Sequence, residues 1–213
     1  MISISRVHYP VTSLGVGRRA GIWFQGCSIG CRGCVSSDTW VASSEHARSV
    51  GDLMDWIRSL PMDELDGLTI SGGEPFEQPD QLRELLIQFH EYRNLLARPI
   101  DILCFSGNTL EHLQNLNSDV LELLDVLVPG RFMESRPTNL IWRGSSNQEL
   151  VLLSELGATR YAEFVDHEPA KKPMQVAVDG DGIWWIGIPG RSDMDELTRR
   201  MAERGVFASG QSW

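Results

Sequence analysis

The chain has 213 residues, of which 42% are hydrophobic and 23% charged, and its formal net charge is −10 at pH 7. This size and composition predict one packed core, with or without a small addition, and exclude an intrinsically disordered chain. The acidic balance excludes the broad basic surface that attracts nucleic acid or an anionic membrane, so we expect neither as a partner.

The first half of the chain predicts alternating strands and helices. Residues 22–24 form a short apolar run typical of a buried strand. A helix is expected over 49–60, because apolar residues recur on one face and Pro61 ends the pattern. The run 68–70 predicts the next strand, and 78–94 predicts a second helix.

The same alternation continues beyond residue 100. A strand is expected over 100–105, a helical stretch to about residue 124 with a break near Asn117, and another strand over 125–128. Strands separated by helices at this spacing are typical of an α/β sheet that is mostly parallel, with right-handed connections.

Each expected strand ends in a loop or a glycine-rich turn. A cysteine-bearing loop follows the first strand, and the turns 71–75, 106–109 and 129–131 follow the others. Because the carboxyl ends of parallel strands meet at one edge of a sheet, we expect these four segments to converge on a single ligand site.

The last part of the chain has a different pattern. Residues 174–178 and 183–188 predict two strands, and the run 179–182 between them is a hairpin signal. A closing helix is expected over 194–203. We therefore expect a small appendage after the α/β core.

Three cysteines lie within eight residues, with the spacing C-x3-C-x2-C: Cys27, Cys31 and Cys34. The first 11 residues lack the basic-then-apolar order of a signal peptide, and no apolar run is long enough to cross a bilayer, so we expect a cytoplasmic location with reduced thiols. Three structural cysteines, or a zinc site with a distant fourth ligand, are the alternatives, although no second ligand pair at zinc spacing is present. We favour an iron–sulfur cluster whose fourth iron has no protein thiolate and stays open to a ligand.

This pattern resembles the radical S-adenosylmethionine superfamily, whose hallmark is the same cysteine spacing. More narrowly, the chain is similar to the activating proteins of anaerobic ribonucleoside-triphosphate reductase, within the glycyl-radical-enzyme activase branch. It departs from many relatives at Val35, where His is common, and at Pro129, where an acidic residue is common. The resemblance rests on segments 14–19, 23–27, 31–34, 71–75, 105–109, 127–132 and 143–148, and on Trp40.

The resemblance implies a [4Fe-4S] cluster on the three cysteines, with S-adenosyl-L-methionine bound at the open iron. It implies an oxidoreductase that takes an electron from an external donor such as flavodoxin or ferredoxin and cleaves S-adenosylmethionine to methionine and a 5′-deoxyadenosyl radical. That radical would install a glycyl radical on a partner enzyme such as anaerobic ribonucleotide reductase. No residue of this chain need act as a general acid or base.

The resemblance also implies a fold and a division of the chain. The expected fold is a partial (β/α)6 radical-SAM barrel with a mostly parallel sheet and a C-terminal appendage of a β-hairpin and a helix. We place the radical-SAM core at residues 1–170, with the cluster loop at 26–40, and the appendage at 171–213.

The turn after the second strand is the next candidate site. Gly72 and Gly73 leave backbone groups open at the strand end, and Glu74 adds a carboxylate. Such a turn suits an ammonium group, and the resemblance implies the amino group of the methionine moiety. The alternative is an ordinary strand-to-helix turn with Glu74 in solvent.

The remaining candidates for cofactor contact are Gly33, Trp40, Ser106 and Arg131. Gly33 lets the cysteine loop wrap tightly, and Ser106 can reach a ligand through its hydroxyl group. Trp40 can wall the pocket or pack beneath the loop, and Arg131 can hold a carboxylate or form a surface ion pair. Cys104 lies inside an expected strand and is read as a buried apolar residue.

Two alternative functions stay open at this point. The first keeps the radical chemistry but acts on a small molecule or a peptide, as in enzymes that make deazapurines. The second is a binding module or redox sensor whose cluster has no catalytic role. The convergence of glycine-rich turns favours catalysis over this second alternative.

Overall fold

The structure, a computed structural model, describes residues 1–179, 182–190 and 193–207. Its centre is a seven-stranded sheet in the order β3-β1-β2-β4-β5-β6-β7, and a second sheet pairs β8 with β9. The strands are β1 (Ile2–Val11), β2 (Arg19–Phe24), β3 (Ala47–Arg48), β4 (Gly67–Gly72), β5 (Asp101–Phe105), β6 (Val126–Val128), β7 (Val151–Leu152), β8 (Met174–Asp179) and β9 (Gly182–Gly187).

The middle of the large sheet is parallel. Strands β2, β4, β5 and β6 run in the same direction, with Ile22 opposite Ile70 and Ile70 opposite Cys104. Strands β1, β3 and β7 pair antiparallel at the margins. The expected α/β class with a parallel central sheet is therefore confirmed.

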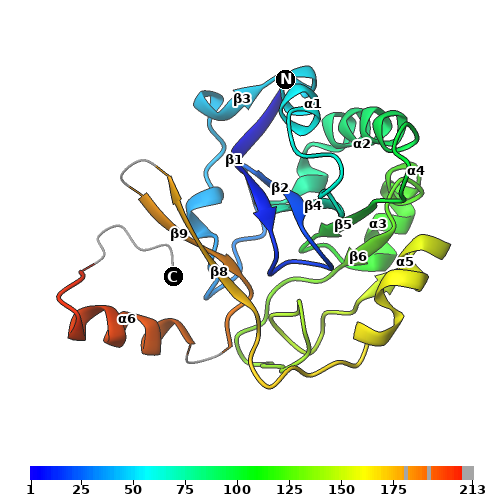
Figure 1. The fold of residues 1–213 in the computed structure, drawn as a ribbon. Helices are drawn as coiled ribbons and strands as arrows, with labels where there is room; N and C mark the ends of the chain where they lie inside the picture. Colours follow the sequence, from blue (N-terminus) through cyan, green and yellow to red (C-terminus); the bar gives the residue numbers. More distant parts are fainter. Residues whose placement is uncertain (180–181, 191–192, 208–213) are drawn as a thin grey trace.

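The helices of the first half follow the predicted pattern. Ser49 caps α1 in a reciprocal capping box with Asp52, and the break expected near Asn117 separates α3 from α4. Helices α1 to α4 lie along one side of the sheet (Figure 1). The α-helices are α1 (Val50–Arg58), α2 (Pro79–Arg93), α3 (Leu110–Leu116), α4 (Ser118–Leu121), α5 (Glu155–Tyr161) and α6 (Asp193–Glu203).

The two faces of the parallel strands contribute to different parts of the core. Ile102 and Cys104 of β5 join the cluster that packs against α1 and α2, whereas Leu103 joins a second cluster with Trp142 and Tyr161. This alternation follows from the two-residue period of a strand. Both faces are buried, which explains why these strands appear in the sequence as continuous apolar runs.

Four of the strands and α-helices described were not expected from the sequence: β1, β3, β7 and α5. Strand β1 is ten residues long and pairs antiparallel with β2, and its Ile2 and Ile4 are fully buried. Strand β7 and helix α5 follow a long irregular segment, where the apolar pattern is weak. Polar residues alternate with apolar ones along β1, so a period-2 pattern was present there.

The C-terminal strands and helix occur where expected. Residues 180–181, at the centre of the expected hairpin turn, lie outside the described residues. The hairpin packs on the N-terminal strands, because Ala177 and Ile186 share a hydrophobic cluster with Val11, Leu14 and Trp23. Figure 1 shows the hairpin and α6 on the side of the sheet away from α1 and α2.

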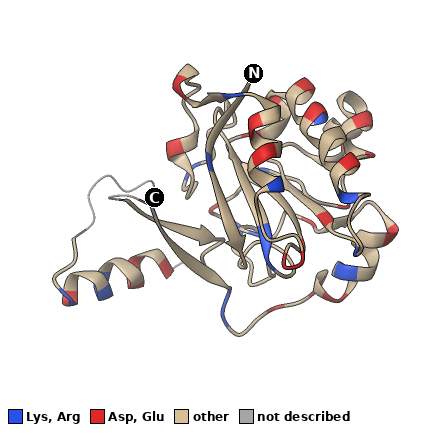
Figure 2. Cartoon of the chain, turned by 45° about the horizontal axis from the view of Figure 1, so that its top comes forward, with Lys and Arg blue, Asp and Glu red and all other residues tan. Residues whose placement is uncertain are grey.

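Charged side chains are distributed over the outer helices (Figure 2). On α6, Glu196 pairs with both Arg199 and Arg200. None of the helices described is both long and apolar enough to cross a membrane.

A buried ion pair joins the amino ends of two parallel strands. The guanidinium of Arg19 on β2 lies 2.6 Å and 3.1 Å from the carboxylate oxygens of Asp101 on β5, and both side chains are fully buried. Arg19 also donates to Thr69, and the hydroxyl of Tyr161 donates to Asp101. Burial alone would lower the pKa of Arg19, but the charge of Asp101 raises it, so the guanidinium stays charged.

We expect Asp101→Asn to lower the free energy of unfolding by about 3–5 kcal/mol, because it leaves the Arg19 charge buried without its counter-ion. Urea unfolding of the variant measures this change. Asp55→Asn is the control, since it breaks the exposed Asp55–Arg58 pair on α1 and should leave the unfolding midpoint nearly unchanged. Equal effects of the two substitutions would contradict the role assigned to the buried pair.

Candidate functional site

A cavity of about 340 Å³ lies at the carboxyl edge of the parallel strands. Its walls come from the cysteine loop after β2, the turn after β4, the turn after β5, the segment 130–148, residues 188–190 and Met194. The four strand-end segments expected to converge therefore do meet. The volume lies within the roughly 300–1,000 Å³ that is common for small-molecule sites.

The cysteine loop folds back on itself through backbone hydrogen bonds. The N–H of Gly26 donates to Thr39 at 2.7 Å, and that of Cys27 donates to Trp40 at 3.0 Å. Gly26, Gly30 and Gly33 all have positive φ angles, of 104°, 57° and 74°. Because most other residues are strained in this region, the glycine spacing allows the tight wrapping that the sequence predicts.

Two glutamines, the buried Gln25 and the half-buried Gln78, hold the loop in place. The side-chain amide of Gln25 donates to the carbonyl groups of Asp38 and Val41, at 3.2 Å and 2.7 Å. Gln78 donates to the carbonyl of Gln25 and accepts a hydrogen bond from Ser3 of β1. The loop is thus tied both to its own far end and to the margin of the sheet.

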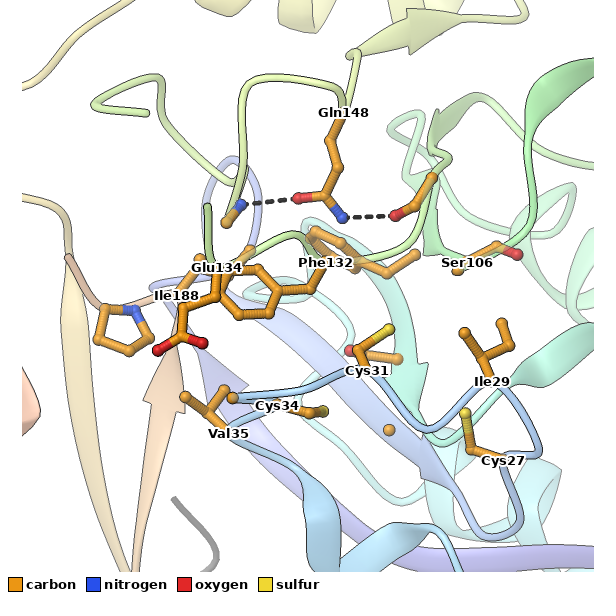
Figure 3. A pocket seen from close by; sticks show the side chains of 18 of the residues that line it. Cys27, Ile29, Cys31, Cys34, Val35, Ser106, Phe132, Glu134, Gln148 and Ile188 are labelled. Atoms are coloured by element: carbon orange, nitrogen blue, oxygen red, sulfur yellow. Dashed lines mark hydrogen bonds between the residues drawn. The ribbon is translucent and has the colours of Figure 1, made fainter. Parts of the chain in front are cut away.

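The three loop cysteines all line the cavity (Figure 3). Cys31 is buried, whereas Cys27 and Cys34 are half-buried, and none of them forms a disulfide. Among the residues described, no three His, Cys, Asp or Glu side chains are grouped closely enough to hold one metal ion. Three soft thiol donors around an open cavity suit a larger iron–sulfur group.

The protein itself disfavours the charged form of one thiol. Burial raises the pKa of Cys27, and the carboxylates of Glu74 and Glu77 add to this effect. Since a metal binds the thiolate, binding at Cys27 would release a proton. Cys104 is fully buried in β5 and packs with the helical core rather than against the cavity, as the sequence indicated.

Gly72 and Gly73 bring the turn after β4 against the cysteine loop. Gly73 donates to the carbonyl of Phe24, and Glu74 donates to that of Gly26, both at 2.8 Å. A Cβ atom at Gly73 would lie 2.2 Å from the carbonyl oxygen of Gly26, and one at Gly72 would lie 2.5 Å from the backbone nitrogen of Phe24. The two glycines are therefore needed for close backbone approach, in addition to any ligand contact.

The carboxylate of Glu74 is buried and accepts hydrogen bonds from the protein. The alternative of an ordinary turn with Glu74 in solvent is therefore wrong. Glu74 as a whole is only 1% exposed. One oxygen accepts from the Ser106 hydroxyl at 2.8 Å and from the N–H of Phe76 at 3.0 Å, and the other accepts from the N–H of Gly107 at 2.7 Å. Burial still raises the pKa of Glu74 despite these donors. Glu74 thus ties the turn after β4 to the turn after β5.

The other sequence candidates take different positions. Gly33, Trp40 and Ser106 line the cavity. Arg131 is not among the described lining residues; its guanidinium donates to the carbonyl of Ile29 in the cysteine loop at 3.2 Å. Thr109 caps α3, as expected.

Several lining residues were not singled out from the sequence, among them Ile29, Phe132, Glu134, Ile188 and Met194. Gln148 is another: its amide accepts from the N–H of Gly144 and donates to the carbonyl of Gly130, both at 2.7 Å (Figure 3). The run 143–148 contributes to the family resemblance, but neither periodicity nor spacing predicts that the Gln148 side chain connects two loops.

Comparisons with known proteins agree with this site. A family model described as a 4Fe-4S single cluster domain matches residues 13–151. The chain is similar to the anaerobic ribonucleoside-triphosphate reductase-activating protein of Vibrio cholerae, with 34% identity over 66% of this chain and 92% of the relative. The protein of the same name from Escherichia coli K12 is 31% identical over 66% and 93%, and that from Enterobacteria phage T4 is 29% identical over 64% and 85%.

We expect the loop cysteines to be required for cluster loading and Cys104 to be dispensable. After anaerobic reconstitution, Cys34→Ala should retain iron and sulfide near background levels, because only two loop thiolates remain. Cys104→Ala should load like the wild type, since that thiol faces the helical core. Iron and sulfide assays with visible absorption spectra measure both results. Full loading of Cys34→Ala would contradict the assignment.

We expect Glu74→Gln to lower the free energy of unfolding by about 1–3 kcal/mol. An amide has one acceptor oxygen, so either the N–H of Gly107 or that of Phe76 would face an NH2 group. Glu91→Gln on the exposed side of α2 is the matched control. Denaturant unfolding measures both, and indistinguishable midpoints would show that the Glu74 bonds do not hold the two turns together.

Proposed function

We propose, because this chain belongs to the family of anaerobic ribonucleoside-triphosphate reductase-activating proteins, that it is a radical S-adenosylmethionine enzyme that installs a glycyl radical on such a reductase. The family match and the 4Fe-4S domain carry the activating role by homology. The observation that carries the chemistry is the meeting of the three-cysteine loop with the strand-end turns around one cavity.

In this proposal Cys27, Cys31 and Cys34 hold a [4Fe-4S] cluster, and S-adenosylmethionine lies beside it in the cavity. When both are bound, they would supply reductive cleavage of S-adenosylmethionine to a 5′-deoxyadenosyl radical, which takes a hydrogen atom from a glycine of the partner. The electron would come from an external donor such as flavodoxin or ferredoxin. The chain's own residues bind, orient and shield these groups.

The turn after β4 suits the cationic substrate. The Glu74 charge forms no ion pair with Lys or Arg in the described part of the chain. Glu74 lines the cavity together with Gly72 and Gly73, which carry no side chains. An ammonium group bound by the backbone at these glycines would experience that negative charge at short range in a poorly screened setting.

The remaining candidates have supporting roles in this proposal. Gly33 and Ser106 line the cavity where backbone and hydroxyl groups can contact the cofactor. Trp40 and Phe132 add apolar wall that excludes water from the reaction. Arg131, through its bond to Ile29, positions the cysteine loop from outside the cavity. We further propose that the parallel strands form a partial (β/α)6 barrel that leaves a side open to a protein substrate.

The proposal predicts cleavage of S-adenosylmethionine without any partner present. Reconstituted protein given S-adenosylmethionine and dithionite under anaerobic conditions should release 5′-deoxyadenosine, measured by chromatography. Cys31→Ala should release none, whereas Cys104→Ala should behave like the wild type.

The partner is tested separately by electron paramagnetic resonance of an anaerobic ribonucleotide reductase after incubation with the loaded protein. A glycyl radical signal that depends on S-adenosylmethionine is expected. A well-loaded cluster that yields no 5′-deoxyadenosine would overturn the enzymatic proposal. Product without a reductase radical would favour a small-molecule or peptide substrate.

A further inference from the structure

A second cavity, of about 230 Å³, adjoins the first one. It lies between β9 and the loop that follows Cys34. The two cavities share lining residues: Val35, Ser71, Phe105, Ile188, Pro189 and Met194. Alone, the second cavity is smaller than the roughly 300–1,000 Å³ of ordinary small-molecule sites. Its shared wall makes it a side extension of the cluster cavity.

The hairpin wall of this second cavity is firmly attached to the N-terminal strands. The side-chain amide of Gln175 on β8 accepts from the N–H of Thr12 at 2.9 Å and donates to the carbonyl of Pro10 at 2.7 Å. The hydroxyl of Ser13 donates to the carbonyl of Ile186 at 2.8 Å. The ring of Trp184 meets Trp23 edge to face, with centroids 5.2 Å apart. These contacts fix the hairpin as a wall of the site.

The second cavity runs along one edge of β9. Its lining includes five consecutive residues of that strand, Ile183 to Gly187, but only Met174 from β8. Because consecutive strand residues point to opposite faces, a cavity lined by all of them follows the strand's edge. In the described part of the chain, β9 pairs with β8 alone. A strand edge without a partner is a common acceptor for an added peptide strand.

The lining favours an uncharged occupant. Arg6 and Asp38 are the charged residues among the described lining, and they form an ion pair with each other. Arg6 also lies over the ring of Trp184, with 5.2 Å from the guanidinium carbon to the ring centroid. With these two charges paired, the described lining residues leave no unpaired charge to bind a charged ligand. Trp184 and Trp185 instead offer apolar contact.

The outer face of the hairpin extends this surface beyond the cavity. Val176, Val178 and Ile183 are 49%, 71% and 55% exposed, and Val178 is the cross-strand neighbour of Ile183. Figure 2 shows uncharged ribbon along most of β8 and β9. An exposed apolar patch that leads into a cavity is typical of a protein-binding surface, because a small molecule could not cover it.

We propose that the edge of β9 binds an extended, uncharged segment of the protein substrate and leads it past Val35 and Ile188 into the cluster cavity. This inference rests on the proposed function. It gives the C-terminal hairpin, which lies beyond the family match at residues 13–151, a role in substrate recognition.

The test compares Ile183→Arg with Ile87→Arg in loaded protein. Both are partly exposed isoleucines, but Ile87 lies on α2. Ile183→Arg should bind the reductase about tenfold more weakly, as expected for loss of one important interface contact. It should also lower the yield of glycyl radical, while release of 5′-deoxyadenosine without partner stays at the wild-type level. Ile87→Arg should match the wild type in all three measurements.

A second measurement does not depend on activity. A photo-cross-linking amino acid, p-benzoylphenylalanine, replaces Ile183 in one variant and Ile87 in another. The cross-link to the reductase should form from position 183 and not from position 87. A cross-link from position 183 to a second copy of the chain, or to the chain's own last residues, would give the edge a different occupant and overturn the proposal.

The outcomes also separate the two proposals. If the wild type releases no 5′-deoxyadenosine from a loaded cluster, the proposed function fails. If it does release 5′-deoxyadenosine and Ile183→Arg binds and activates the reductase as well as the wild type does, only the role of the β9 edge is wrong.

Discussion

The close approach of the turn after β4 to the cysteine loop is the constraint on which the site depends. Strands β2 and β4 are parallel neighbours, so their carboxyl ends necessarily adjoin. Gly73 and Glu74 then donate to the carbonyl groups of Phe24 and Gly26, a contact that leaves no room for a side chain at position 73. The cysteines are thereby held at one edge of the sheet, and the cavity forms between this loop and the next turns.

The two ends of the parallel sheet are stabilised by different electrostatics. At the amino end, Arg19 and Asp101 neutralise each other in full burial. At the carboxyl end, Glu74 is held by hydroxyl and N–H donors and forms no ion pair within the described residues. The amino end is therefore electrostatically closed, whereas the carboxyl end keeps a negative charge beside the cavity. That asymmetry suits a cationic ligand on one side only.

The C-terminal part of the chain adds walls to the site. In the family-matched core alone, the cavity would lack the wall formed by Ile188, Pro189 and Met194. That wall comes from the two residues that follow β9 and from the first turn of α6, and β9 itself lines a second cavity that joins the first. The attachment of the hairpin through Gln175 and Trp184 involves β1 and β2, the same strands that precede the cysteine loop. The proposed substrate surface and the cysteine loop thus share one support.

The parallel strands, the first four helices and the candidate loops could be predicted from local patterns in the chain. Their apolar runs and caps act over a few residues, and the order of parallel strands brings their ends together. The spacing of Cys27, Cys31 and Cys34 likewise indicated the cluster chemistry, because ligand spacing is local. Strand β1 carried an alternating pattern, but its antiparallel pairing depends on a neighbour in space rather than on its own residues.

The way in which distant side chains complete the site could not be predicted from local patterns, because it depends on contacts formed in the folded chain. Glu74 joins two turns that are 32 residues apart in the chain, and Gln148 spans the segments on either side of Phe132. Arg131 is a candidate for a ligand carboxylate, and in the structure its guanidinium donates to the carbonyl of Ile29, which lies 102 residues away in the chain. The hairpin wall is the clearest case, since Gln175 reaches β1 across more than 160 residues. Such contacts arise when folded elements pack, and no local pattern in the chain encodes them.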